Sequence, residues 1–407
     1  MLRKIKKLLS RTLGAFTGFL ALALPQIVYA ADGLDKGDTG LMLTSTLLVL
    51  LMALPGLALF YGGLVRSKNT GTVIMESYGI AMVTTILYVL MGYGLAFGHG
   101  NGLFGGLHNF ALSTLSVESL VGTIPESLFI LFNLSLMIFT TVLIIGAFSG
   151  RIKYTSVLLF AGAWGLLVYS PVCHMIKGGG YLSHIGLLDF GGGSVIHITA
   201  GIAALVTALY LSKRNGKGHI EPKPQNATMF YLGAILLVLG SLGLIMGSVF
   251  TLGGKAGMAL LVMLIAGAMS SITWLVIDLF RHKKPSLYGL LTGTIIGLVG
   301  ITPAAGYILP LDALTMGLVI GLLGYFACYH LKRRFGYDDI YDIFSVFGVG
   351  SILGMLLTGM FVAGPMGIMH QLIIQIKGVS LVVLYTGIVT YLILYFIDRM
   401  FGLRARR

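Results

Sequence analysis

Two polar residues in one apolar segment could carry chemistry inside a membrane. Asp189 precedes the glycine run of DFGGGSVIH, and His197 follows eight residues later on the same predicted helix. A carboxylate at a helix start accepts hydrogen bonds from the free N–H groups of the next turn, so Asp189 is explained as a helix cap. An imidazole in an apolar interior is either a satisfied core histidine or a group that hydrogen-bonds a ligand and relays a proton. His197 is therefore a candidate functional residue.

The elements that must position these residues belong to a membrane protein. Of the 407 residues, 57% are apolar types and 10% are charged, whereas soluble domains carry about 25% charged residues. The 58 glycines lie largely within apolar runs, which is typical of closely packed membrane helices. Cys173 and Cys328 lie in separate apolar segments and form neither a disulfide framework nor a metal-binding spacing. We therefore expect no soluble enzyme, no cofactor and no nucleic-acid partner.

Residues 1–30 have the pattern of a cleavable signal peptide. Five basic residues in MLRKIKKLLSR precede an apolar run, and short side chains at Val28 and Ala30 favour cleavage after Ala30. A retained first helix is the alternative, although Pro25 interrupts the run and the run is shorter than the roughly 20 residues of a span. Cleavage would place residue 31 outside a bacterial-type inner membrane or an equivalent one.

The remaining residues, 31–407, form one membrane domain with connections too short to bury a soluble core. Its apolar stretches have about the length that a transmembrane helix needs. We predict an all-α integral membrane protein with eleven transmembrane helices, over residues 41–65, 73–98, 126–148, 154–175, 191–212, 227–250, 256–280, 286–303, 312–331, 343–363 and 371–398.

The basic residues predict the orientation of these helices. Alternate connections and the C-terminal tail hold 18 Lys and Arg residues, whereas the opposite side holds four, at positions 36, 177, 255 and 377. Because cytoplasmic loops are rich in Lys and Arg, the N-terminus of the membrane domain is predicted to lie outside and its C-terminus in the cytoplasm. The formal charge of +13 is explained by this topology.

A faint internal repeat agrees with an odd number of helices between related segments. Asp189 with Ser194-Val195 before one helix is echoed by Asp342 with Ser345-Val346 before another, five spans later. Five spans would give the two halves opposite orientations, as in inverted-repeat transporters.

Several spaced motifs resemble the ammonium transporter (Amt/Mep/Rh) family. The strongest are PGLALFYGGLVRSKN at 55–69 and DFGGGSVIHITAGIAALVTALYLSKR at 189–214. The supporting stretches agree in order over the mature chain: GAFSGRIKY at 146–154, HMIKGGG at 174–180, LVGITPAAGYI at 298–308, DDIYDIFSVFG at 338–348, HQLIIQ at 370–375 and FGLR at 401–404. The resemblance implies an eleven-helix fold with inverted five-helix repeats, assembled as a homotrimer, with a narrow pore through each subunit.

The resemblance also implies roles for three residues. His197 matches the first pore histidine of the family, and Ser248 matches its ligand-binding serine. The aspartate that matches Asp189 supports the outer cation site indirectly. For Ser248, a hydroxyl bonded to its own helix is the alternative explanation.

Several positions of the predicted pore depart from the family. Phe347 stands where the second pore histidine is expected, and Leu136 and Leu244 stand where two stacked phenylalanines close the pore. Lys177 replaces the tryptophan that helps to cage the cation, and Ser241 replaces a second tryptophan near the gate. Phe132 is also predicted to line the pore.

These departures predict a changed ligand site. Ammonium is a small cation with four donors, which aromatic faces and oxygen acceptors recognise. Lys177 places a positive charge at the mouth unless its ammonium group turns into solvent, and leucines offer no ring quadrupole. We therefore expect ammonium to bind deeper, between His197 and the face of Phe347, in a pore that conducts poorly.

Three functions follow from the sequence: an ammonium channel or transporter, an ammonium sensor that signals to a cytoplasmic module, and a regulatory subunit without ligand binding. A P-II-type regulator is a partner that the family resemblance implies. Other intramembrane polar residues are most simply packing or interfacial groups: Glu76, Glu126, Asp278 and His330. The acidic cluster of Asp338, Asp339 and Asp342 is expected to pair with nearby basic residues or to cap the next helix.

Overall fold

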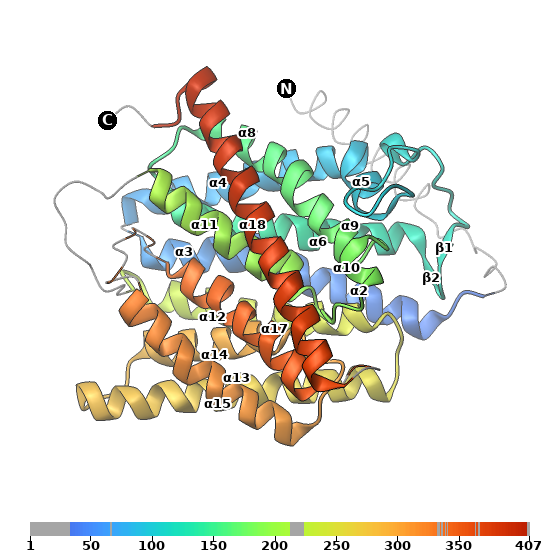
Figure 1. Cartoon of the computed structure of the whole chain (residues 1–407). Helices are drawn as coiled ribbons and strands as arrows, with labels where there is room; N and C mark the ends of the chain where they lie inside the picture. Colours follow the sequence, from blue (N-terminus) through green and yellow to red (C-terminus); the bar gives the residue numbers. More distant parts are fainter. Residues whose placement is uncertain are drawn as a thin grey trace, which may run out of the picture. The chain divides into compact units, whose positions relative to one another are not determined.

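The computed structural model describes residues 33–404 except 66, 212–223, 332, 333, 335, 336, 338, 340, 363, 365 and 366. The predicted signal peptide, residues 1–30, lies outside the described residues. From Asp35 onward the chain forms one compact unit that is built almost entirely of helices (Figure 1). A single two-stranded antiparallel ribbon, β1 (Leu120–Val121) with β2 (Ile124–Pro125), is the only sheet among these residues.

The helices of the first half are α2 (Lys36–Leu51), η1 (Met52–Gly56), α3 (Leu57–Leu64), α4 (Ser67–Leu87), η2 (Tyr88–Gly92), α5 (Tyr93–Phe97), η3 (Phe110–Leu112), α6 (Glu126–Leu143), α7 (Ile145–Phe148), α8 (Tyr154–Trp164), η4 (Gly165–Tyr169), α9 (Ser170–Ile176), α10 (Tyr181–His184), η5 (Gly193–Ile198) and α11 (Thr199–Tyr210). Those of the second half are α12 (Ala227–Val249), α13 (Gly254–His282), α14 (Leu287–Ile301), α15 (Pro310–Phe326), η6 (Ala327–Leu331), η7 (Phe344–Val349), α17 (Gly350–Phe361) and α18 (Ile368–Phe401).

The predicted all-α membrane fold is confirmed, and the described helices agree with the eleven predicted spans. Within the described chain, ten helical stretches are long and apolar enough to cross a membrane, and α14 is a shorter apolar helix at the position of the eighth predicted span. Several of the spans contain a π-helical turn. For example, α2, η1 and α3 together form one continuous span, and η5 and α11 form another.

Polar residues start several of these helices as the sequence would predict. Asp35 accepts a hydrogen bond from the Asp38 N–H at the start of α2, and Ser286 accepts one from Gly289 at the start of α14. Such caps satisfy N–H groups that have no partner within the helix.

Equivalent features of the two halves of the domain are separated by 150 residues. Asp189 and Asp339 are 150 residues apart, and each carboxylate accepts a hydrogen bond from the N–H five residues later. Gly192 and Asp342 are also 150 residues apart, and both have a left-handed backbone, with φ of 80° and 54°. The π-helical turns η5 and η7 follow these residues. The equivalence of Asp189 with Asp342 that the sequence suggested is therefore wrong, because Asp342 matches Gly192.

Close approach of backbones holds the centre of the domain together. A Cβ atom at Gly201 would collide with the backbone of Gly348, so α11 and η7 meet there without an intervening side chain. This contact places the two repeats side by side at the residues that follow His197 and Phe347. The abundance of glycine is thus explained by helix packing.

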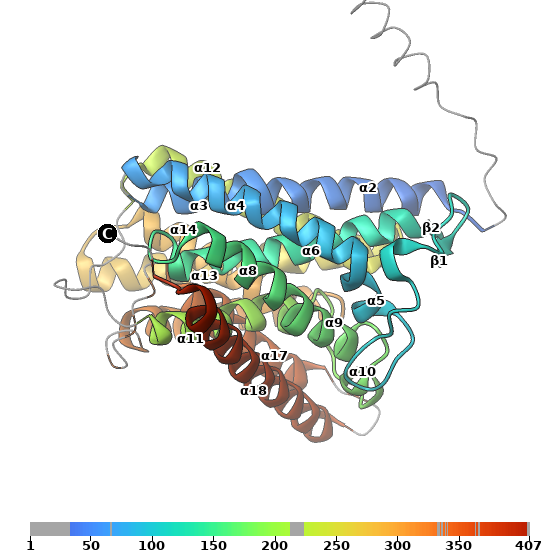
Figure 2. The same ribbon diagram turned by 90° about the horizontal axis from the view of Figure 1, so that it is seen from above.

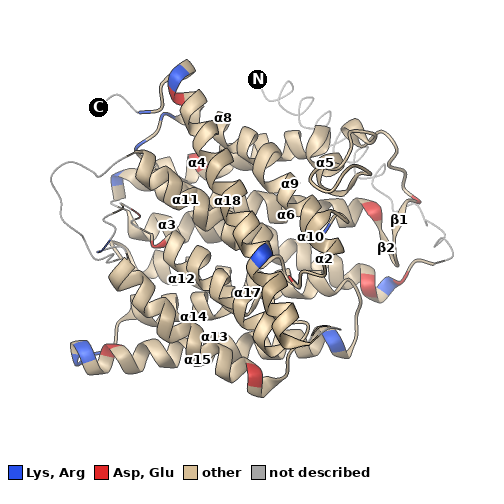
Figure 3. Cartoon of the chain, in the orientation of Figure 1, with Lys and Arg blue, Asp and Glu red and all other residues tan. Residues whose placement is uncertain are grey.

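The long helix α18 crosses one face of the bundle obliquely, over α11 and α17, whereas α2, α3 and α4 lie on the opposite face (Figures 1 and 2). Lys and Arg lie mostly near helix ends (Figure 3). For example, α13 carries Lys255 at its start and Arg281 near its end. We call the end of the bundle that carries Asp189 the Asp189 end, and the opposite end the Asp339 end.

Candidate functional site

A cavity of about 120 Å³ opens at the Asp189 end. It lies between α5, α6, η4, α9, η5 and the end of α12. Four phenylalanine rings form much of its wall, at positions 97, 129, 132 and 250. The cavity therefore has the aromatic character that small cations favour.

Four of the predicted site residues line this cavity, namely Phe132, Leu136, Lys177 and Ser248. Phe132 is 1% exposed, and its ring occupies the space where a Cβ atom at Gly247 would stand. Leu136 lies one turn further along α6 and is 8% exposed. Its side chain provides an apolar surface without a ring quadrupole at this depth.

Lys177 is held at the mouth of the cavity. Its Nζ donates to the carbonyl oxygens of Asp189, at 2.5 Å, and Phe190, at 2.8 Å. The ammonium group is therefore tied to two backbone carbonyls, although the residue as a whole is exposed. It joins the end of α9 to the segment before η5 and leaves a positive charge at the mouth.

Asp189 is buried and holds the first turn of η5. Its Oδ1 accepts from the Gly193 N–H at 2.6 Å, and its Oδ2 accepts from the Ser194 N–H at 2.8 Å. Burial raises the pKa of the Asp189 carboxyl, whereas the nearby Lys177 ammonium and the two N–H donors oppose this rise. The geometry is that of a helix cap, which agrees with the structural role predicted for Asp189.

His197 lies deeper, directly after the cavity-lining residues Val195 and Ile196 of η5. Its ring is next to two phenylalanines, with centroid distances of 5.7 Å to Phe347 and 6.5 Å to Phe139. The side chain is 4% exposed, and its Nδ1 atom is buried without a hydrogen-bond partner among the described residues. His197 is thus not a satisfied core histidine, because a buried polar atom without a partner is costly.

Phe347 occupies the position in η7 that His197 occupies in η5. Both lie eight residues after the capping aspartate of their own half, Asp339 and Asp189. The distance of 5.7 Å and the interplanar angle of 47° are within the range of direct aromatic contact.

The remaining predicted residues, on α12, bond mainly to their own helix. The Ser248 hydroxyl lines the cavity but donates to the Leu244 carbonyl at 2.8 Å. Ser241 donates to the Leu237 carbonyl at 2.7 Å, and its hydroxyl lies 3.9 Å from the sulfur of Met52. Leu244 is 1% exposed and is absent from the described residues that line the cavity. The structure thus separates Leu244 and Ser241 from the cavity and keeps Ser248 in its wall as an acceptor.

Sequence reasoning missed Phe139 and Phe250. Phe250 closes the cavity next to Phe129, with a ring distance of 5.6 Å, and adopts a left-handed backbone with φ of 63° after α12. Phe139 lies on α6, two residues before the Thr141 hydroxyl that bonds back to its helix. A phenylalanine in an apolar helix gives no signal in the sequence that it faces a histidine.

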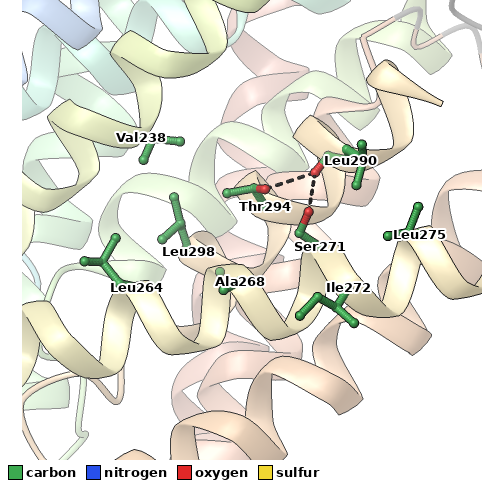
Figure 4. A pocket seen from close by; sticks show the side chains of 10 residues that line it. Val238, Leu264, Ala268, Ser271, Ile272, Leu275, Leu290, Thr294 and Leu298 are labelled. Atoms are coloured by element: carbon green, nitrogen blue, oxygen red, sulfur yellow. Dashed lines mark hydrogen bonds between the residues drawn. The ribbon is translucent and has the colours of Figure 1, made fainter. Parts of the chain in front are cut away.

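A second concavity, of about 400 Å³, lies away from the cavity just described, between α12, α13 and α14 (Figure 4). Its wall is apolar apart from two hydroxyls. Ser271 and Thr294 both donate to the Leu290 carbonyl, at 3.0 Å each. With these donors satisfied internally, this groove offers an apolar surface and no recognition of a charged ligand.

The fold defines a multi-spanning membrane protein with an aromatic cavity at one end and a buried imidazole, His197, directly after two of the cavity's lining residues. Residues 40–407 match the model of the Ammonium Transporter Family, and the chain belongs to that family. An ammonium transporter of Bacillus subtilis is 38% identical over 384 residues, which are 91% of this chain and 94% of that protein.

Solved structures agree with this assignment. The crystal structure of Candida albicans Mep2 is similar with a TM-score of 0.86 and 32% identity, and it covers 93% of this chain and 88% of that one. A chain described as "Sensor Amt Protein" has a TM-score of 0.84 at 22% identity, over 91% of this chain and 95% of that one. The second likeness shows the shared fold alone.

Proposed function

We propose that this protein binds ammonium beside His197, conducts it slowly and acts as an ammonium sensor. The observation that carries the proposal is the buried His197 ring, which is next to Phe139 and Phe347 and has its Nδ1 atom unpartnered in the described part of the chain. The family membership supplies ammonium as the ligand class.

The surroundings of His197 suit ammonium. A neutral imidazole offers one acceptor nitrogen, and ammonium has four N–H donors. The Phe347 and Phe139 rings attract a cation within about 6 Å of their centroids. An ammonium ion bonded to His197 would thus replace part of its lost hydration with one acceptor and two ring faces.

Slow conduction follows from what stands beyond His197. A paired histidine relay needs a second imidazole, and Phe347 supplies an apolar ring at the equivalent position of the other half. Moving an ion through an apolar passage is costly. A ligand that binds at His197 therefore has no second acceptor of this kind to move to.

The cavity at the mouth supports the same view. Lys177 keeps a positive charge on the segment before η5, which repels an approaching cation at close range. The aromatic wall attracts the cation, so capture depends on the balance between the two. This arrangement favours ligand binding at the deeper site.

We place the protein in a bacterial-type inner membrane, after removal of residues 1–30, with the Asp189 end outside and the C-terminus in the cytoplasm. The distribution of Lys and Arg supports this orientation. We propose a homotrimer, and the apolar groove between α12, α13 and α14 is a surface that assembly would cover. A cytoplasmic signalling module or a P-II-type regulator would receive the signal.

Ordinary ammonium transport is the second candidate function. The observation that favours it is the 38% identity with a curated relative that is named an ammonium transporter, over nearly the whole length of both chains. Binding and flux measured on the same preparation separate the two functions, because a sensor binds ammonium without comparable flux.

The test uses the purified protein in detergent for calorimetry and in liposomes for flux. The proposal predicts saturable ammonium binding that His197→Ala weakens by about a hundredfold. His184→Ala is the matched control, because His184 is exposed on α10 and bonds through Nδ1 to the Gly180 carbonyl. Unchanged affinity in His197→Ala would remove His197 from the site.

A further inference from the structure

The glutamine at the end of the HQLIIQ motif is a buried polar residue within a membrane helix. Gln375 lies on α18, seven residues after the helix begins, and is 0% exposed. An amide in this position needs a hydrogen-bond partner for each polar atom, because no water replaces a missing one. The partners of Gln375 therefore indicate what it does.

The side-chain amide of Gln375 forms two hydrogen bonds with the backbone of Leu188, one through its oxygen and one through its nitrogen. Its Oε1 accepts from the Leu188 N–H at 3.0 Å, and its Nε2 donates to the Leu188 carbonyl at 2.8 Å. The second N–H of Nε2 points to the Met355 carbonyl at 3.2 Å. A paired contact of this kind fixes both the position and the rotation of the Leu188 peptide units.

The residue after Leu188 is Asp189, which caps η5. A shift of Leu188 therefore displaces the carboxylate that holds the Gly193 and Ser194 N–H groups. These groups begin the turn that carries His197. Gln375 on α18 is thus connected to His197 by a short run of backbone and two hydrogen bonds.

Other contacts hold the segment further along. The Lys177 ammonium bonds to the Asp189 and Phe190 carbonyls. The Phe190 and Gly191 N–H groups donate to carbonyls at the end of α14, those of Pro303 and Thr302. Among these contacts, Gln375 is the side chain that fixes the residue immediately before Asp189.

We propose that Gln375 is a positioning residue for ammonium binding, which sets the placement of Asp189 and of the His197 ring against Phe347. The inference rests on the proposed function at His197, because it concerns the geometry of that site. A residue that served only for packing would not need paired hydrogen bonds to the N–H and the carbonyl of one residue.

The far end of α18 strengthens this proposal. Asp398 accepts a hydrogen bond from the Tyr210 hydroxyl at 3.1 Å, at the last residue of α11. The span formed by η5 and α11 is therefore joined to α18 near both of its ends, through Leu188 and through Tyr210. Gln375 thus fixes the Leu188 end of the contact between α18 and the span of η5 and α11, which carries His197.

Three variants test the proposal in the full-length protein. Gln375→Leu removes both contacts with Leu188. Gln375→Glu keeps an acceptor for the Leu188 N–H and loses the donor for its carbonyl. Thr386→Val is the matched control on the same helix, because the Thr386 hydroxyl is buried and has no partner among the described residues.

Hydrogen exchange over residues 186–194 and the ammonium affinity are measured for all three. We expect Gln375→Leu to speed exchange in this segment and to weaken ammonium binding by about tenfold, the effect of two neutral hydrogen bonds. We expect a smaller change for Gln375→Glu and wild-type behaviour for Thr386→Val. Unchanged exchange in Gln375→Leu overturns the proposal, and so does faster exchange with unchanged affinity.

The experiment keeps the two proposals apart. If the wild-type protein binds no ammonium, the proposed function fails, and the positioning of ammonium by Gln375 fails with it. If the wild type binds and Gln375→Leu matches it in both measurements, only the role of Gln375 fails. Thermal melting of each variant confirms that the protein tested is folded.

Discussion

The two halves of the domain share one backbone plan and present different side chains at the centre of the bundle. In both halves an aspartate caps the coming turn, a residue with a left-handed backbone follows three positions later, and a π-helical turn begins. Eight residues after the aspartate, the first half has His197 and the second has Phe347. The scaffold that presents the side chain is thus shared, whereas the side chain itself is not.

Equivalent backbone turns of the two halves thus bring an imidazole and a phenyl ring together, with their centroids 5.7 Å apart. A backbone at this position can present an imidazole or a phenyl ring without changing the fold. Substitutions of His197 and of Phe347 therefore test the two halves separately, through their effects on ammonium binding and on ammonium flux.

The largest effect is expected from His197→Ala. Loss of the acceptor nitrogen and of a ring next to two phenylalanines should weaken ammonium binding by about a hundredfold, the upper range for a hydrogen bond to a charged group. Calorimetry on the detergent-solubilised protein measures the change. An affinity within threefold of wild type would show that the first half does not hold the ligand.

The next effect concerns the second half. Phe347→His restores an imidazole beside His197 and should raise ammonium flux in liposomes by at least about tenfold, which is below the roughly hundredfold or more that a well-positioned proton-transfer group contributes. Phe347→Leu removes the ring without adding an acceptor and should leave the flux low. Equal gains in both variants would mean that the ring acts only as an obstruction.

The two capping aspartates provide a matched pair. Asn offers one acceptor oxygen where Asp offers two, so Asp189→Asn and Asp339→Asn should each destabilise the protein by about 1 kcal/mol, the usual net contribution of one hydrogen bond. Only Asp189→Asn should also weaken ammonium binding, because Asp189 holds the turn that carries His197. Melting temperatures and calorimetry report the two effects. An equal loss of ammonium binding in both variants would contradict the claim that only the half with Asp189 and His197 holds the ligand.

The smallest effect is expected at the mouth. Lys177→Met removes a positive charge near the cavity and should tighten ammonium binding about threefold, an effect that fades at high salt. Lys255→Met is the control, because Lys255 lies over the Phe190 ring, 5.5 Å from its centroid, at the same end of the bundle. Equal tightening in both variants would mean that general surface charge, not Lys177, controls capture.

Much of the fold was predictable because apolar runs of about 20 residues have few alternatives to membrane helices. The eleven spans agree with the structure to within a few residues at most ends. The π-helical turns and the equivalence of Asp189 with Asp339 were not predictable, because they depend on how backbones meet across the bundle. The sequence pointed instead to Asp342, which shares only its residue type with Asp189.

The candidate site was predictable in part. His197 and Lys177 stood out because ionisable side chains are rare in an apolar chain. The contacts of Lys177 with two carbonyls, the enclosure of His197 by Phe139, and the grip of Gln375 on Leu188 depend on residues distant in sequence. Ser248 bonds to its own helix because a serine hydroxyl reaches the carbonyl four residues earlier.

The central claim, that ammonium binds beside His197 in a pore that conducts it slowly, is tested most directly by ammonium flux into proteoliposomes. The wild-type protein is compared at equal density with the Bacillus subtilis ammonium transporter and with protein-free liposomes, after calorimetry has shown saturable ammonium binding. The account predicts flux close to that of protein-free liposomes. Flux comparable to that of the Bacillus subtilis protein would contradict it.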